Sequence, residues 1–129
     1  MYEEIPEQFW ADLESEFTLP SLEQVRTRIE SLTSDPEPVM RRLVRVFVQD
    51  DTFCPGFQFL PGGGLHPGVL ALFGRALELN IPHNTFTRWM LTALPGPGVR
   101  PVDAMHRREQ LLAELSGFAR RTAPPPVRR

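Results

Sequence analysis

The chain has 129 residues, with 14 prolines, 9 glycines, one cysteine and 14 basic residues, all of which are arginine. The lack of lysine excludes a Walker-A phosphate loop, a Schiff-base lysine and a lysine general base. One cysteine cannot form an internal disulfide. No apolar run reaches the roughly 18 residues of a membrane span, and the first residues are too acidic for a secretory signal. We therefore expect a cytoplasmic protein with no membrane contact.

The net charge of −2 is divided unevenly along the chain. Residues 1–37 hold ten acidic residues and two arginines, whereas residues 100–129 hold seven arginines and three acidic residues. Such an acidic front and basic back can pair with each other or bind separate partners. The acidic front would repel phosphate, which makes it a poor candidate for contact with nucleic acid.

Three short helices are predicted in residues 1–42. Helical spacing of apolar side chains predicts the first, after Pro6 and up to residues 18–20, from Phe9, Trp10, Leu13 and Phe17. A capping box of Ser21 and Gln24 predicts the second, whose apolar face comprises Leu22, Val25, Ile29 and Leu32. The third is expected to have Asp35 as its N-cap and Pro36 at its first position.

The hydrophobic period then changes from that of a helix to that of a strand. Alternation from Val44 to Gln49, followed by a turn at Asp50 and Asp51, predicts a β-hairpin over residues 43–59. Pro55 restricts its own position to an edge or a bulge. The alternative is that the third helix runs on to Phe47.

The remaining residues predict helices separated by proline-rich loops. Pro67 begins a helix with a core stripe of Val69, Leu72, Phe73, Ala76 and Leu77, and the next helix presents Phe86, Trp89, Met90 and Ala93. After a rigid connection at residues 94–98, Pro101 begins a short helical turn. The last helix buries Leu111, Leu112, Leu115, Phe118 and Ala119. We expect a mostly α fold with one small β-hairpin around a single core, divided into residues 1–42, residues 43–119 and a flexible basic arm at 120–129.

No set of residues predicts catalysis, a cofactor or a metal ion. His66, His83 and His106 have no ligand-like spacing, and Cys54 has no CxxC partner and fits a buried, inert thiol. Residues 62–64 lack the spacing of a dinucleotide loop, and adjacent aspartates at 50 and 51 are typical of a turn. We therefore expect a protein that is not an enzyme.

Two segments are candidates for binding a partner. Trp89 lies on the inner stripe of its helix, so it is either a core residue or a partner contact. Arg100-Pro101-Val102-Asp103 is either an ordinary capped helix start or a rigid, charged corner where Arg100 makes a bidentate contact with a partner.

The order of several motifs resembles a known family. The motifs are Pro55-Gly56-Phe57-Gln58-Phe59, His66-Pro67, Arg88-Trp89-Met90, Arg100-Pro101-Val102-Asp103 and a leucine-rich last helix. Over about residues 43–119 this order resembles the Xre/MbcA/ParS-type toxin-binding domain of bacterial type II antitoxins. The loop at residues 94–98 departs from the family because it lacks an asparagine. The acidic first helix also has no counterpart there.

The resemblance implies a protein without catalytic activity that neutralises a toxin encoded by a neighbouring gene. The usual partner in the family is a RES-domain toxin that depletes NAD, and the toxin-binding domain obstructs the toxin's active-site entrance. The predicted partner-binding residues are Trp89, Arg100, Pro101 and Asp103 of the motifs together with Arg107, Arg120 and Arg121, whose positive charge would complement a partner surface.

Family members often carry a helix-turn-helix and repress their own operon, so operator DNA is a second expected partner. Residues 22–59 could form such a unit with the hairpin as a wing, using Arg41, Arg42 and Arg45. However, Asp35 and Glu37 would place carboxylates where base-reading side chains normally lie. An adaptor that has lost its toxin is a third alternative. A homo-oligomer could form through the apolar face of the first helix.

Overall fold

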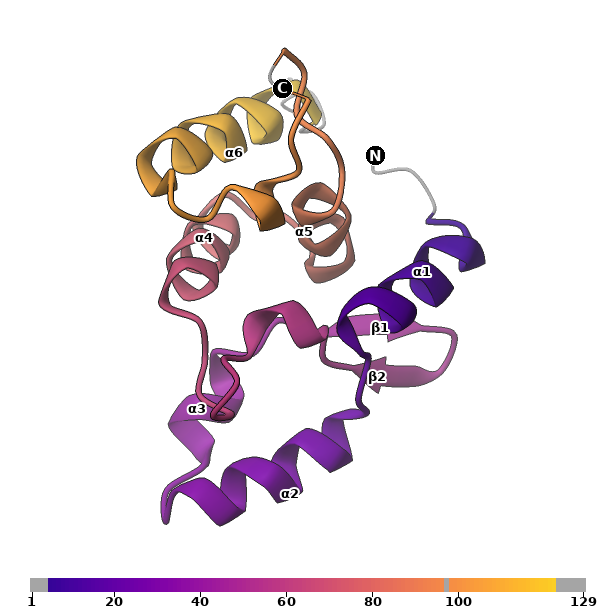
Figure 1. Cartoon of the computed structure of the whole chain (residues 1–129), viewed down its shortest axis with the longest axis vertical. Coiled ribbons are helices and arrows are strands. Elements are labelled where there is room, and N and C mark those ends of the chain that lie inside the picture. The colour runs from indigo at the N-terminus through magenta and orange to yellow at the C-terminus, as the bar shows by residue number, and fades with distance from the viewer. Residues whose placement is uncertain (1–4, 97, 123–129) are drawn as a thin grey trace, which may run out of the picture.

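The computed structural model describes residues 5–96 and 98–122, and it has the predicted mostly α fold with one small β-hairpin (Figure 1). The elements, in chain order, are α1 (Glu7–Phe17), α2 (Leu22–Leu32), α3 (Glu37–Arg41), β1 (Val46–Val48), β2 (Asp51–Phe53), the 3-10 helix η1 (Gly56–Gln58), α4 (Pro67–Glu78), α5 (His83–Met90), the 3-10 helix η2 (Pro101–Asp103) and α6 (Arg108–Thr122). Among the helices of residues 5–96 and 98–122, none combines the length and the hydrophobicity that a membrane span requires.

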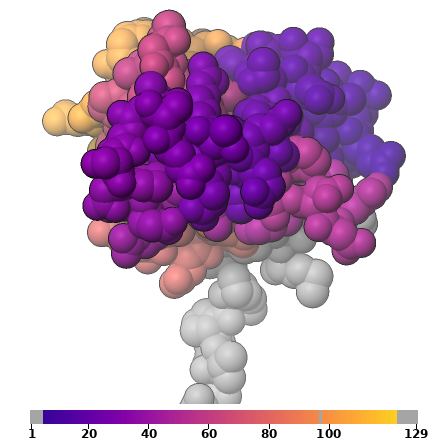
Figure 2. All heavy atoms as spheres, turned by 90° about the horizontal axis from the view of Figure 1, so that it is seen from below, coloured from indigo at the N-terminus to yellow at the C-terminus, as the bar shows by residue number. Residues whose placement is uncertain are grey.

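The helices form two groups that meet at the hairpin. Helix α6 packs on α4, and α5 contacts both β1 and η2, whereas α2 and α3 pack on each other at the opposite end (Figure 1). Figure 2 shows α2 covering that end of the molecule, with α1 and the hairpin beside it. Helix α1 contacts η1, which brings the acidic front of the chain against its centre.

The helix starts follow local side-chain chemistry. The Ser21 hydroxyl accepts from the Gln24 backbone N–H at 3.2 Å and the Gln24 side chain accepts from the Ser21 N–H at 2.9 Å, which confirms the predicted capping box. His66 caps α4, since its Nδ1 accepts from the Gly68 N–H at 3.0 Å. The prediction for α3 was wrong by one residue: Pro36, already in the helical region at φ −74°, is the N-cap in place of Asp35.

The predicted hairpin is present but shorter than residues 43–59. Val46 pairs with Phe53 and Val48 with Asp51, so the turn consists of Gln49 and Asp50, not of Asp50 and Asp51. Gln49 takes a φ of 57°, which lets two residues reverse the chain. The extended run predicted after Cys54 is interrupted by η1, and the alternative of a helix running on to Phe47 was wrong.

The backbone groups along the outer edge of β1 form hydrogen bonds with side chains of α5 and not with a third strand. The Asn84 amide brackets Phe47: its Oδ1 accepts from the Phe47 N–H at 2.8 Å, and its Nδ2 donates to the Phe47 carbonyl at 2.9 Å. Two residues earlier in the chain, the Arg45 N–H donates to His83 Nδ1 at 3.0 Å. The start of α5 therefore holds the hairpin through its backbone.

The buried apolar side chains fall into two clusters, where a single core was expected. The larger cluster contains Trp10 and Leu13 of α1 together with residues of α4, α5 and α6. The smaller cluster lies under α2 and α3 and comprises Val25, Ile29, Met40, Leu43 and Cys54. The predicted stripe of α4 is buried except for Leu77, which is 48 % exposed. Ala93 is also exposed, since α5 ends at Met90.

Because its imidazole is partly buried, His83 is expected to make the protein less stable in mild acid. Burial lowers the pKa of its imidazole below the ordinary value of about 6.5, and the nearby Arg45 guanidinium acts in the same direction. In mild acid, His83 therefore binds a proton more readily in the unfolded chain than in the folded chain. The contribution of neutral His83 to the free energy of unfolding should therefore be fully present above about pH 6.5. It should be lost as the pH falls through the lowered pKa of His83 in the folded protein.

Urea unfolding at several pH values between neutral and mildly acidic conditions measures this effect. We expect the decline to be smaller in His83→Gln and unchanged in His106→Gln, since His106 is exposed. An equal decline in wild type and His83→Gln would contradict the assignment to His83.

Candidate partner-binding surface

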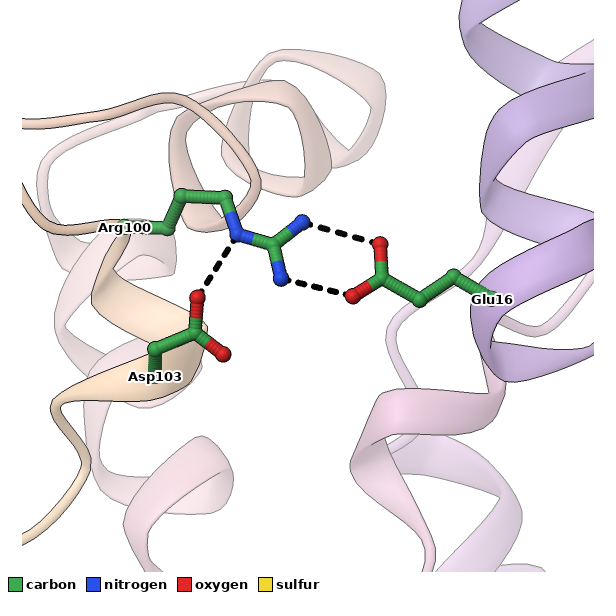
Figure 3. Close-up of polar contacts among 3 residues, drawn as sticks. All are labelled: Glu16, Arg100 and Asp103. Atoms are coloured by element: carbon green, nitrogen blue, oxygen red, sulfur yellow. Dashed lines mark hydrogen bonds and ion pairs between the residues drawn. The ribbon is translucent and has the colours of Figure 1, made fainter.

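Arg100, the arginine predicted to contact a partner, instead forms ion pairs with other residues of the same chain. Its two terminal nitrogens donate to the Glu16 carboxylate at 2.9 and 2.6 Å, and its Nε donates to Asp103 Oδ2 at 2.7 Å (Figure 3). The guanidinium carbon also lies 6.0 Å from the centre of the Phe17 ring. We call Glu16, Arg100 and Asp103 the arginine clasp. The bidentate contact predicted for Arg100 is thus made with α1.

The arginine clasp joins the acidic front of the chain to its basic back. Its hydrogen bond to Arg100 holds the pKa of Glu16 below the ordinary value, and the two carboxylates raise the pKa of Arg100. Glu16 was not predicted as a site residue. The excess of acid in residues 1–37 indicated the sign of the charge that Arg100 meets, but it could not distinguish Glu16 from nine other carboxylates.

A double-mutant cycle with Arg100→Ala and Glu16→Ala should give a coupling free energy of about 0.5–1 kcal/mol at low salt. The Arg100 side chain is 29 % exposed, so solvent screens the pair and added salt should reduce the coupling further. Urea unfolding of the four proteins measures it. The matched control is the cycle for Arg75 and Glu78, an exposed single-contact pair on α4. A coupling no larger than that of the control would contradict the role of the bidentate geometry.

Two other predicted partner residues are buried. Trp89 is 5 % exposed and its ring is stacked with that of Phe86 at 6.2 Å, so the core alternative for Trp89 is the one the structure supports. Pro101 is also buried, at the first position of η2. Both side chains therefore support the surface from beneath, and neither is available for contact with a partner in this conformation.

The three predicted partner arginines at the two ends of α6 are exposed, but they do not form one patch. Arg107 lies just before α6 begins, whereas Arg120 and Arg121 lie in its last turn. With a rise of about 1.5 Å per residue, the two ends are roughly 20 Å apart. Cations at the C-terminal end also suit the helix dipole. Residues 120–122, predicted as part of a flexible arm, belong to α6, and the rest of that arm lies outside the described residues.

The three arginines predicted to contact DNA do not project together from a recognition helix. Helix α3 has only five residues. Arg41 Nε donates to the Glu37 carbonyl at 3.4 Å and Arg45 donates to the Met40 carbonyl at 2.9 Å, so both side chains fold back on α3. Arg42 is exposed. Glu37 also pairs with Arg26 of α2 at 2.8 Å, which keeps a carboxylate where phosphate would approach.

The side chains considered for chemistry are separated in space or buried. The Cys54 thiol is fully buried, and burial raises its pKa to about 11, so it carries no thiolate at neutral pH. In residues 5–96 and 98–122, no three His, Cys, Asp or Glu side chains are grouped so that they could hold a metal ion.

The Pro55–Phe59 motif, which contributes to the family resemblance, has a structural role in this chain. Gly56 allows the end of α1 to approach, since its N–H donates to the Thr18 carbonyl at 3.1 Å. Phe57 packs edge-on against Phe17 at 6.0 Å. Buried Gln58 binds the backbone of Val44 in both directions, at 2.8 and 2.9 Å. The motif therefore joins the end of α1 to the segment that leads into β1.

No family model, no curated protein and no solved structure matches this chain. The resemblance to the antitoxin domain accordingly depends on the motif order in the sequence.

Proposed function

We propose that this protein is an antitoxin-like binding protein without catalytic activity of its own. Its partner is a toxin encoded by a neighbouring gene, of the NAD-depleting RES type by resemblance. Binding neutralises the toxin by covering the entrance of its active site.

The observation that carries this proposal is the order of the motifs between Pro55 and the last helix. The exposed arginines of α6 support it. Arg107, Arg120 and Arg121 present guanidinium groups at two ends of one helix, so a partner surface must span about 20 Å to meet both. Guanidinium groups pair bidentately with carboxylates, which favours an acidic partner surface.

Co-expression with the neighbouring gene product tests the proposal. The wild-type protein should restore growth and cellular NAD, and the purified pair should form a stable complex. The double variant Arg120→Glu/Arg121→Glu should bind about tenfold more weakly or worse, with a smaller dependence on salt. The matched control is Arg28→Glu, which reverses an exposed charge on α2 at the other end of the molecule.

Three results would reject the proposal. The neighbouring protein could be harmless, it could be equally toxic with and without this chain, or the two proteins could fail to associate at low salt. Equal binding by the wild type and the double variant would still support an antitoxin function, but it would show that Arg120 and Arg121 lie outside the interface.

A further inference from the structure

A groove separate from α6 is formed by three distant parts of the chain. It encloses a cavity of about 340 Å³. The cavity is lined by the start of α1, the hairpin and the first turn of α5, through Ile5, Glu7, Trp10, Phe47, Val48, Gln49, Asn84 and Thr85. Helix α1 and the hairpin lie side by side in both views of the molecule (Figures 1 and 2). We call this feature the hairpin groove.

Phe47 gives the hairpin groove an exposed aromatic surface on a fixed backbone. Its side chain is 51 % exposed. Its backbone N–H and carbonyl are both bound by the Asn84 amide, and its ring meets the His83 ring edge-on at 5.8 Å. His83 in turn packs edge-on against buried Phe73 at 4.8 Å. A large aromatic side chain that is held in place while still facing water loses little entropy on binding, which is typical of an interface hot spot.

The charge around the groove is acidic. Among the described lining residues Glu7 is the charged one, and within the described part of the chain its carboxylate receives one long hydrogen bond, of 3.5 Å, from Gln49 Nε2. Asp50 and Asp51 follow directly in the hairpin and are exposed. Within the described ranges, none of the lining side chains is basic. Arg88, one turn beyond Asn84 on α5, does not line the cavity. A ligand that complements this rim must carry positive charge.

We propose that the hairpin groove is a second docking surface, which binds a protein segment in which an apolar side chain is followed by arginine or lysine. The apolar side chain packs on the exposed ring of Phe47. The basic side chain pairs with Glu7. This surface differs from the α6 arginines in position and in sign of charge, so the inference does not depend on the antitoxin function.

Selection from a random-peptide phage library on the immobilised full-length protein tests the proposal without knowledge of the natural partner. Synthetic peptides of the enriched sequences are then titrated calorimetrically against the wild type, Phe47→Ala, Glu7→Arg and Leu77→Ala. Leu77 is the matched control, because it is 48 % exposed but lies on α4 outside the groove. Circular dichroism and urea unfolding establish that each variant is folded.

The enriched peptides should combine an apolar side chain with an adjacent arginine or lysine. They should bind Phe47→Ala and Glu7→Arg at least about tenfold more weakly than the wild type, and Leu77→Ala with unchanged affinity. Should Phe47→Ala fail to fold, Glu7→Arg on the exposed face of α1 still gives the same test. The proposal is overturned if no peptide is enriched, if the enriched peptides are acidic, or if they bind Glu7→Arg as tightly as the wild type.

Discussion

Replacing Gly56 with alanine is expected to lower the free energy of unfolding by about 3 kcal/mol or more. A Cβ atom at this position would overlap the carbonyl oxygen of Phe17, at the end of α1. That oxygen belongs to the backbone, so it cannot move aside as the tip of a side chain could. The hydrogen bond of 3.1 Å from the Gly56 N–H to the Thr18 carbonyl would be strained as well. Urea unfolding followed by circular dichroism measures the loss.

The same substitution at Gly74 provides the control. Gly74 lies within α4, and a Cβ atom added there would meet nothing within 4 Å. Alanine favours the helix over glycine by about 1 kcal/mol, so Gly74→Ala should stabilise the protein. Opposite signs at the two positions would tie the effect at Gly56 to its contact with α1. A loss below about 1 kcal/mol in Gly56→Ala would show that α1 can move away without consequence for the core.

Replacing Gln58 with leucine should cost roughly 3–5 kcal/mol, although the two side chains are similar in size. Gln58 is 2 % exposed. Its amide accepts from the Val44 N–H at 2.8 Å and donates to the carbonyls of Val44 and Pro55 at 2.9 and 3.0 Å. Leucine would leave the buried N–H and carbonyl of Val44 without this partner, and each such group costs about 1–3 kcal/mol.

Gln110→Leu is the matched control for this prediction, because Gln110 is exposed on α6 and its replacement should change stability by less than about 0.5 kcal/mol. The two variants are compared by urea unfolding, with near-ultraviolet circular dichroism to report aromatic packing. A Gln58→Leu protein as stable as Gln110→Leu would mean that the backbone of Val44 finds another partner, which would refute the role assigned to the amide.

Local chemistry explains why most of the fold could be predicted from the sequence. The Ser21 capping box, the helix opened by Pro67 and the last amphipathic helix each depend on residues only a few positions apart, and all three are present. The errors lie where a local preference meets tertiary packing. Residues 54–59 were predicted to be extended, but Cys54 is held by the Pro20 carbonyl and η1 turns beneath α1, contacts that no pattern within the segment reveals.

The candidate site was less predictable, because it depends on which charges meet across the fold. Arg100 was predicted to make a bidentate contact with a partner, but in the structure it makes that contact with Glu16, which lies 84 positions away in the same chain. Trp89 could be assigned only to an inner helical stripe, which does not distinguish a core residue from one at an interface. The hairpin groove was missed for the same reason, since Ile5, Phe47 and Asn84 come together only in three dimensions.

The pairing of α5 with the outer edge of β1 has a consequence for how the protein behaves among copies of itself. An unpaired strand edge is a template on which other chains can add strands and aggregate. Here the exposed N–H groups of that edge are already bound, at Arg45 by His83 and at Phe47 by Asn84. On the other side of the hairpin, Ser21 bridges to Phe53. Substitution of His83 or Asn84 would therefore leave an unpaired edge to which other copies of the chain could add. The resulting aggregation would appear at high protein concentration, even where the single folded chain is unchanged.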